Sequence, residues 1–179
     1  MKKLLFPSLA WSIIVGLSSC ISGSNQQQAD YLLLVHEGDS FEFGTPCGYA
    51  TPQGDTVIPL GKYFHCYTDT FRTQAVVLDQ DGICKAIDRN EEEIYRVMWY
   101  DNGPDYLVDG LFRIIRDGKT GYANEQGDVV IEPQFACAFP FENGKAKVAL
   151  NCTLTEDGEY TVMESDEWFY IDKTGNRTE

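Results

Sequence analysis

The amino-acid sequence predicts an all-β fold, built from tandem antiparallel β-hairpin units that stack into a curved array, either solenoid-like or incomplete propeller-like. Residues 48–58 recur almost unchanged at residues 121–131. Short strand-like runs alternate with turns that contain glycine, and no long segment between turns shows the 3.6-residue period of a helix. Repeated units of this kind bury their apolar faces against their neighbours.

The repeated segment predicts a β-hairpin. Eight of eleven positions are identical between residues 48–58 and 121–131. A third, shorter copy spans residues 168–175, and a degraded copy is expected over residues 76–88. In each copy an aromatic and aliphatic strand runs into turn-type residues that end in glycine. A type I turn with a G1 bulge needs a positive φ at that place, which glycine tolerates. The structural turn glycines are Gly54, Gly127 and Gly175.

The segments after the second hairpin also read as strands and turns. Pro133 is expected to end the second strand, because proline has no N–H to donate to a ladder. Residues 142–144 form a predicted turn, and residues 145–150 alternate in polarity. This alternation would place Ala146, Val148 and Leu150 on one face of a strand.

The N-terminus resembles that of a bacterial lipoprotein precursor. Lys2 and Lys3 precede an apolar run over residues 4–17, and Leu-Ser-Ser-Cys at 17–20 is similar to a lipobox. The resemblance implies cleavage before Cys20 and acylation of that residue, for example with palmitate, which anchors the chain in a membrane. An ordinary secretory signal is the alternative. The expected parts are a signal peptide (1–19), the lipidated Cys20 with a flexible tether (20–30) and a β-repeat domain (31–179).

Composition excludes several function classes. The chain carries 28 acidic and 14 basic residues, a formal net charge of -14, whereas nucleic-acid binding needs clustered Lys and Arg. The same charge opposes docking on anionic lipid. With two histidines in the whole chain, little material exists for a zinc site or a histidine-based triad. We therefore expect no nucleic-acid partner, no metal and no cofactor.

No catalytic residue is predicted, and the chain is expected not to be an enzyme. The sequence lacks the common nucleophile, metalloprotease and phosphate-loop motifs. His65 and Cys66 are neighbours, so in a strand they would point to opposite faces. An envelope hydrolase that uses two of the many carboxylates is a remaining alternative. Asp79, Asp81 and residues 101–105 have the oxygen density of calcium loops, but they lack the EF-hand glutamate and are expected to form ordinary turns.

Five cysteines follow Cys20, and none of their spacings suits a compact zinc knuckle. Their odd number leaves at least one thiol free or paired between molecules. Cys66 and Cys137 occupy matching places in the first two units, where a buried free thiol that acts as a small apolar side chain is expected. Disulfide formation is the alternative, because an exported domain meets an oxidising environment. The five are Cys47, Cys66, Cys84, Cys137 and Cys152.

The chain resembles the WG-repeat family over roughly residues 47–175, and most specifically over residues 100–150, which contain one full unit. The likeness lies in residues 121–127 and 130–133, and in Phe135, Ala138, Phe141, Gly144, Ala146 and Val148. No Trp-Gly pair occurs: Cys47 and Thr120 stand where tryptophan would, and Phe169 replaces the glycine after Trp168. The resemblance implies a non-enzymatic binding or scaffolding element, here in a Bacteroidetes-like lipoprotein.

Two functions are expected from these features. The first is a protein-interaction or scaffolding module at the cell envelope, held to the bacterial outer membrane by its lipid. In Bacteroidetes-type lipoproteins, which this N-terminus resembles, chains that reach the cell surface often carry acidic residues directly after the cysteine. Here no acidic residue follows Cys20 until Asp30, so the resemblance slightly favours the periplasmic face over the cell surface. The second is a glycan- or cell-wall-binding module. Tyr49, Tyr122 and Tyr170 recur at one repeat position, with Trp168 nearby. Burial of all three tyrosines favours the scaffold, and exposure of all three on one face favours glycan.

Overall fold

The computed structural model describes residues 30–158 and 160–178. Every helix or strand assigned in these ranges is a β-strand, which confirms the all-β prediction. Accordingly, these residues contain no helix long and apolar enough to cross a membrane. The predicted signal peptide, Cys20 and the tether up to residue 29 lie outside the described residues.

The strands are short, and all their pairings are antiparallel. In chain order they are β1 (Leu32–His36), β2 (Cys47–Ala50), β3 (Thr56–Tyr63), β4 (His65–Cys66), β5 (Thr70–Phe71), β6 (Gln74–Leu78), β7 (Cys84–Asp88), β8 (Glu93–Val97), β9 (Trp99–Tyr100), β10 (Gly103–Pro104), β11 (Leu111–Arg116), β12 (Lys119–Asn124), β13 (Val129–Phe135), β14 (Cys137–Ala138), β15 (Lys145–Ala149), β16 (Thr153–Asp157), β17 (Tyr160–Glu164), β18 (Phe169–Asp172) and β19 (Arg177–Thr178).

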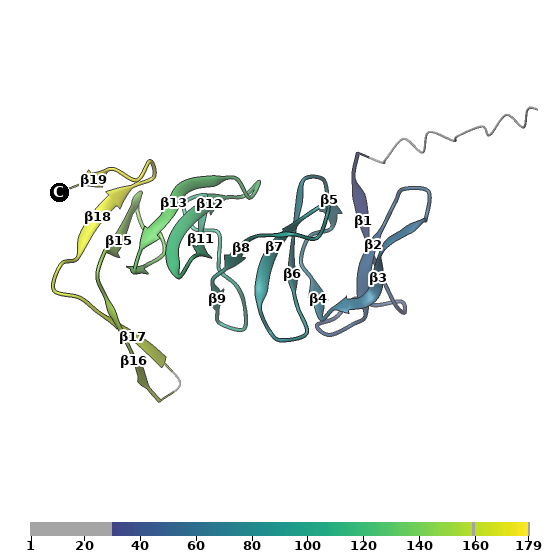
Figure 1. Cartoon of the computed structure of the whole chain (residues 1–179), viewed down its shortest axis with the longest axis horizontal. Coiled ribbons are helices and arrows are strands. Elements are labelled where there is room, and N and C mark those ends of the chain that lie inside the picture. Colours follow the sequence, from purple (N-terminus) through teal and green to yellow (C-terminus); the bar gives the residue numbers. More distant parts are fainter. Residues whose placement is uncertain (1–29, 159, 179) are drawn as a thin grey trace, which may run out of the picture.

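Three sheets and two hairpin ribbons make up the described part of the chain. The N-terminal sheet has the order β3-β2-β1-β5, the central sheet β13-β12-β11-β8-β7-β6-β4, and the C-terminal sheet β14-β15-β18-β19. Figure 1 shows them following one another along the longest axis, with the β16–β17 ribbon projecting from the row. The chain enters the central sheet at β4, returns to the N-terminal sheet for β5 and crosses back at β6. It passes to the C-terminal sheet between β13 and β14.

One five-residue turn recurs throughout the structure. In residues 51–55, 124–128 and 172–176 the first residue exchanges backbone hydrogen bonds with the fourth and fifth residues. Its side-chain oxygen also accepts the N–H of the fifth residue. The glycine at the fourth place has a φ of 95° in Gly54, 83° in Gly127 and 85° in Gly175. These values match the type I turn with a G1 bulge.

The degraded copy over residues 76–88 is also a hairpin with this turn. β6 and β7 are joined by residues 79–83, and Gly82 has a φ of 80°. Asp79 accepts the N–H groups of Asp81 and Ile83 and pairs with Lys85 at 2.8 Å. Although burial raises the pKa of the Asp79 carboxyl, hydrogen bonds from Lys85 and the Ile83 N–H lower it overall. Its oxygens are therefore occupied by the turn.

A fifth copy of the turn lies in the acidic run at residues 88–93, which the sequence predicts to be a solvated hairpin tip but does not identify as a copy. Residues 88–92 join β7 to β8 with the same backbone bonds. Glu91 stands at the glycine place with a φ of 66°. Its carboxylate binds Lys62 Nζ at 2.7 Å and the Tyr63 hydroxyl at 2.9 Å, and thereby joins β3 of the N-terminal sheet to the central sheet.

The strand that contains Pro133 was predicted wrongly. β13 continues through Pro133 to Phe135, because it is an edge strand with a bulge opposite Gly121. A Cβ on Gly121 would clash with the backbone of Ile131, Glu132 and Pro133. Gly48 meets the backbone of residues 58 and 59 in the same way. The glycine before Tyr49 and the glycine before Tyr122 are thus required by close backbone approach.

The face assignment of residues 145–150 was correct except at its end. Ala146 and Val148 are buried in the core, and the turn before them has positive φ at both Asn143 and Gly144. Leu150, however, is 51% exposed. β15 ends at the fully buried Ala149, so the alternation does not reach Leu150.

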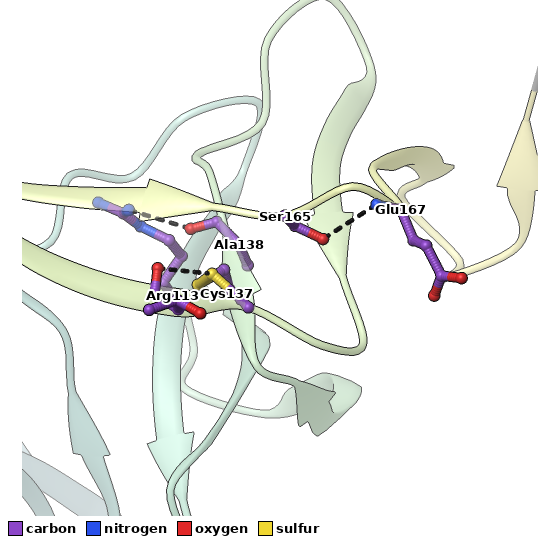
Figure 2. Close-up of a disulfide and its surroundings, with 7 residues drawn as sticks. Arg113, Cys137, Ala138, Ser165 and Glu167 are labelled. Atoms are coloured by element: carbon purple, nitrogen blue, oxygen red, sulfur yellow. Dashed lines mark hydrogen bonds between the residues drawn. A yellow bond between two sulfur atoms is a disulfide. The ribbon is translucent and has the colours of Figure 1, made fainter.

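A buried ion pair, which the sequence did not reveal, joins the central and C-terminal sheets. Arg113 on β11 binds both carboxylate oxygens of Asp105, at 2.6 and 2.9 Å, with side-chain exposures of 6% and 1%. Its Nη1 also donates to the carbonyl oxygen of Ala138 on β14 (Figure 2). Because both charges are paired and hydrogen-bonded, loss of either partner would leave an uncompensated charge in the core.

The turn glycines yield a stability prediction. Gly54→Val should cost about 1–3 kcal/mol of unfolding free energy, since a β-branched residue is strained at positive φ. A Cβ at Gly54 meets nothing within 4 Å, whereas one at Gly127 would clash with the Gln74 amide and lie 3.0 Å from the Tyr95 hydroxyl. Gly127→Val should therefore cost more in urea unfolding.

Asp128→Ala serves as the neighbouring control. This substitution leaves the backbone of the turn and the Asp128 N–H bond to Asn124 in place. It should cost well under 1 kcal/mol, as expected for an exposed side chain. Equal losses for the two valine variants would contradict the packing part of the argument.

Candidate binding surface

Two of the three repeat tyrosines belong to the core. Tyr49 and Tyr122 are 0% and 1% exposed. The Tyr49 hydroxyl donates to the carbonyl of Thr68 at 2.9 Å, and that of Tyr122 to the carbonyl of Phe139 at 2.7 Å. Burial raises the pKa of both phenols, which therefore stay protonated and act as donors.

Each buried tyrosine also meets a phenylalanine edge to face. The ring centroids of Tyr49 and Phe71 are 5.2 Å apart at 71°, and those of Tyr122 and Phe141 are 4.8 Å apart at 70°. The same pair of contacts, one carbonyl and one phenylalanine ring, therefore closes the first and second units.

The third tyrosine lies on the surface instead. Tyr170 occupies the same place before the turn glycine as the other two, yet it is 46% exposed. In the C-terminal sheet, Tyr170 pairs with Lys147 and Thr178, while its neighbour Ile171 faces the core. Burial of the three tyrosines thus gives a divided result: Tyr49 and Tyr122 are core residues, and Tyr170 is available to a ligand.

What we term the C-terminal aromatic face consists of Tyr170 and three further side chains: Phe139, Lys147 and Trp168. Lys147 Nζ lies 4.9 Å from the Trp168 ring centroid and 5.9 Å from that of Phe139. The two rings are 5.4 Å apart. Because Val148 and Ile171 point to the core, alternation directs Lys147 and Tyr170 to the opposite side of the sheet.

Beside this face lies an open hollow of about 490 Å³. Glu164, Asp166 and Glu167 give it an acidic lining, and the Ser165 hydroxyl accepts the N–H of Glu167 at 3.1 Å (Figure 2). Its other lining residues are Asn151, Cys152 and Thr153. Glu167 directly precedes Trp168, so the hollow and the aromatic face are adjacent.

Cys152 lines the hollow, and it forms a disulfide with Cys137. Figure 2 shows this disulfide. Cys137 is buried as predicted, but it is not a free thiol. Matching repeat places did not reveal this pairing, because Cys152 lies in the connection to the β16–β17 ribbon, outside the repeated pattern. The bond fixes the point at which the chain leaves β15.

A second aromatic group lies at the other end of the chain. Phe41 stacks on His65 at 4.7 Å and 6°, and Phe43, 60% exposed, packs against Phe64. Burial lowers the pKa of His65, so its ring is neutral near pH 7 and stacks like another aromatic ring. Cys66 points into the core, on the side away from His65. Sequence reasoning missed this group because Phe41 and Phe43 lie in a loop.

Asp101 and Asp105, which have the oxygen density of a calcium loop, bind other side chains. Within residues 30–158 and 160–178, no three side chains of His, Cys, Asp and Glu are grouped so as to hold a metal ion. Asp101 accepts a hydrogen bond from the Tyr106 hydroxyl at 3.0 Å, and Asp105 is held by Arg113. Cys20, the predicted lipidation site, lies outside the described residues.

The divided roles of the tyrosines can be tested by removing one hydroxyl at a time. Tyr122→Phe should lower the unfolding free energy by about 1 kcal/mol, because the Phe139 carbonyl loses its donor. Tyr170→Phe should change it by less than about 0.5 kcal/mol, as for other exposed sites. Chemical denaturation of both variants measures the difference, and equal losses would contradict the assignment.

Residues 121–151 match the protein family described as WG containing repeat. The matched segment begins at Gly121 in β12, includes β13, β14 and β15, and thus contains the buried Tyr122 with its carbonyl acceptor. This supports the WG-repeat resemblance for that unit. No curated protein and no solved structure matches the chain.

Proposed function

We propose that this protein is an exported, lipid-anchored and non-enzymatic repeat protein that serves as a protein-interaction module at the bacterial cell envelope. The observation that carries the proposal is the C-terminal aromatic face, where Tyr170 is exposed although its two counterparts are core residues. The WG containing repeat at residues 121–151 supports a scaffold-type chain, and the lipobox-like residues 17–20 support the anchor.

The proposed architecture is a curved stack of units with an open C-terminal end. Tyr122 faces the core between the central and C-terminal sheets, and the next residue, Ala123, faces the preceding core. In the third copy Ile171 corresponds to Ala123, and it fills the core that contains Tyr122, so Tyr170 faces outward. Within the described residues no further sheet covers this side. The aromatic face is therefore the surface on which a partner would continue the stack.

The chemistry of this surface favours a protein partner. Aromatic residues are enriched at the cores of protein interfaces and often dominate their energetics. The carboxylates of Glu164, Asp166 and Glu167 lie beside the rings and supply a polar rim for basic side chains. A suitable partner places an apolar side chain against Tyr170 and Trp168. A flanking Lys or Arg of that partner then reaches the acidic hollow.

A glycan ligand is the second candidate. Trp168 and Tyr170 are two ring systems on one exposed side of a sheet, an arrangement on which sugar rings can stack. The acidic hollow would then favour a neutral or cationic sugar over a uronic acid. With either kind of ligand, the proposed location of the protein is the periplasmic face of the outer membrane.

Site-specific photo-crosslinking in cells separates these candidates. A photoreactive phenylalanine analogue at position 170 of the full-length chain should give a covalent protein adduct. The matched control is position 106, because Tyr106 is 53% exposed but lies in a different loop. No adduct at 170, or equal adducts at both positions, would reject the protein-partner proposal. Binding of the purified chain to a glycan array, lost in Trp168→Ala, would support the second candidate instead.

The lipid anchor has its own test. Cys20→Ser should block acylation, so that the protein stays as full-length precursor or moves from the membrane fraction to the soluble fraction. Fractionation and intact mass of both forms measure this. Unchanged mature mass and membrane association in the variant would reject the lipobox interpretation.

A further inference from the structure

A second pair of cysteines lies in the N-terminal core. The Sγ atoms of Cys47 and Cys66 are 2.8 Å apart, which is closer than two unbonded sulfurs normally approach. Both residues are essentially inaccessible, at 0% and 1% exposure. Cys84, the third free thiol among the described residues, lies in a different core cluster.

The pair spans a junction between two sheets. Cys47 begins β2 of the N-terminal sheet, and Cys66 ends β4 of the central sheet. Cys66 also occupies the same repeat place as Cys137, which forms the disulfide of the second unit. The partner differs, since Cys47 precedes Cys66 in the chain whereas Cys152 follows Cys137. One repeat place therefore presents a sulfur to a second cysteine in both units.

We propose that Cys47 and Cys66 form a second disulfide in the protein as it occurs in the cell, so that the N-terminal and central sheets are covalently joined. A disulfide S–S bond is about 2.05 Å long, so the two sulfurs need a small further approach. Cys84 then remains the single free thiol of the described residues.

The chemistry is ordinary thiol–disulfide exchange with an exported dithiol oxidoreductase as oxidant. The thiolate of one cysteine attacks the oxidoreductase disulfide, whose S–S bond breaks and whose leaving sulfur takes up a proton. The second thiolate then attacks the mixed disulfide and releases the reduced oxidoreductase. The pair loses two electrons and two protons, and the oxidoreductase gains them.

Burial dictates when this exchange takes place. It raises the pKa of both thiols and shields them from other proteins. The crosslink therefore forms before the N-terminal unit closes, and once formed it resists reductants. Cys152, by contrast, is partly exposed, so a mild reductant should open Cys137–Cys152 first.

The experiment maps every cysteine in the full chain isolated from cell envelopes. Free thiols are blocked with N-ethylmaleimide in denaturant at lysis, and disulfides are then reduced and labelled with iodoacetamide. Peptide mapping should show maleimide on Cys84 and iodoacetamide label on Cys47, Cys66, Cys137 and Cys152. A non-reduced digest should contain a peptide pair linked through Cys47 and Cys66.

The inference rests on export, as proposed above, for its oxidant, and the outcomes separate the two. Maleimide on Cys47 and Cys66 with Cys137–Cys152 intact overturns the inference and leaves export standing. Maleimide on all of these cysteines contradicts both. A link from Cys47 or Cys66 to any other cysteine also overturns the inference.

Thermal unfolding provides an independent readout. A reductant that opens every disulfide should lower the Tm of the wild-type chain more than that of the double variant Cys47→Ala/Cys66→Ala, which has one crosslink fewer to lose. Cys84→Ala is the matched control, because it removes a buried thiol of the same size and should keep the full wild-type response. Equal reductant-induced shifts in the wild-type chain and the double variant would overturn the inference.

Discussion

The buried phenol of the repeat tyrosine is the interaction on which the arrangement of the units depends. A hydroxyl in the core must find an acceptor, because an unpaired polar group there is costly. Tyr49 and Tyr122 find it in a backbone carbonyl of the segment that leaves the hairpin. The same segment brings in Phe71 or Phe141 and starts the next part of the fold. One tyrosine thus determines where the chain goes after each of these two hairpins.

Local rules explain which parts of this fold could be predicted from the sequence. The hairpins and their glycine turns depend on a few neighbouring residues, so Gly54, Gly127 and Gly175 were found by comparing copies. The turn at Glu91 was not recognised as a further copy, because a non-glycine residue stands at the glycine place. Its carboxylate pairs with Lys62. Pro133 was misjudged because its effect depends on whether the strand lies at an edge, a property of the sheet. The pairings of Asp105 with Arg113 and of Cys137 with Cys152 follow from tertiary structure alone.

The candidate site shows the same limit. Trp168 and Tyr170 were singled out from the sequence, but their surroundings come from strand register, which brings Lys147 opposite Tyr170 and Phe139 against Trp168. Tyr170 and Tyr49 precede the turn glycine by the same distance, and the local difference is that Phe169 stands where Gly48 does. That difference does not show which tyrosine is buried, because burial depends on the next segment, which covers Tyr49 and leaves Tyr170 open. Exposure at a repeat position therefore depends on the neighbouring unit.

A row of sheets has few contacts between distant parts, so each junction must be stable by itself. The junction between the central and C-terminal sheets is held by Arg113, which binds Asp105 and the Ala138 carbonyl, and by the closure over Tyr122. Glu91 joins the N-terminal and central sheets, beside the proposed crosslink. At the second junction, Arg113 donates to the carbonyl oxygen of Ala138 on β14, the strand that directly precedes Phe139. The aromatic face is thus held on a fixed support, so a partner that binds there pays little entropy for ordering it.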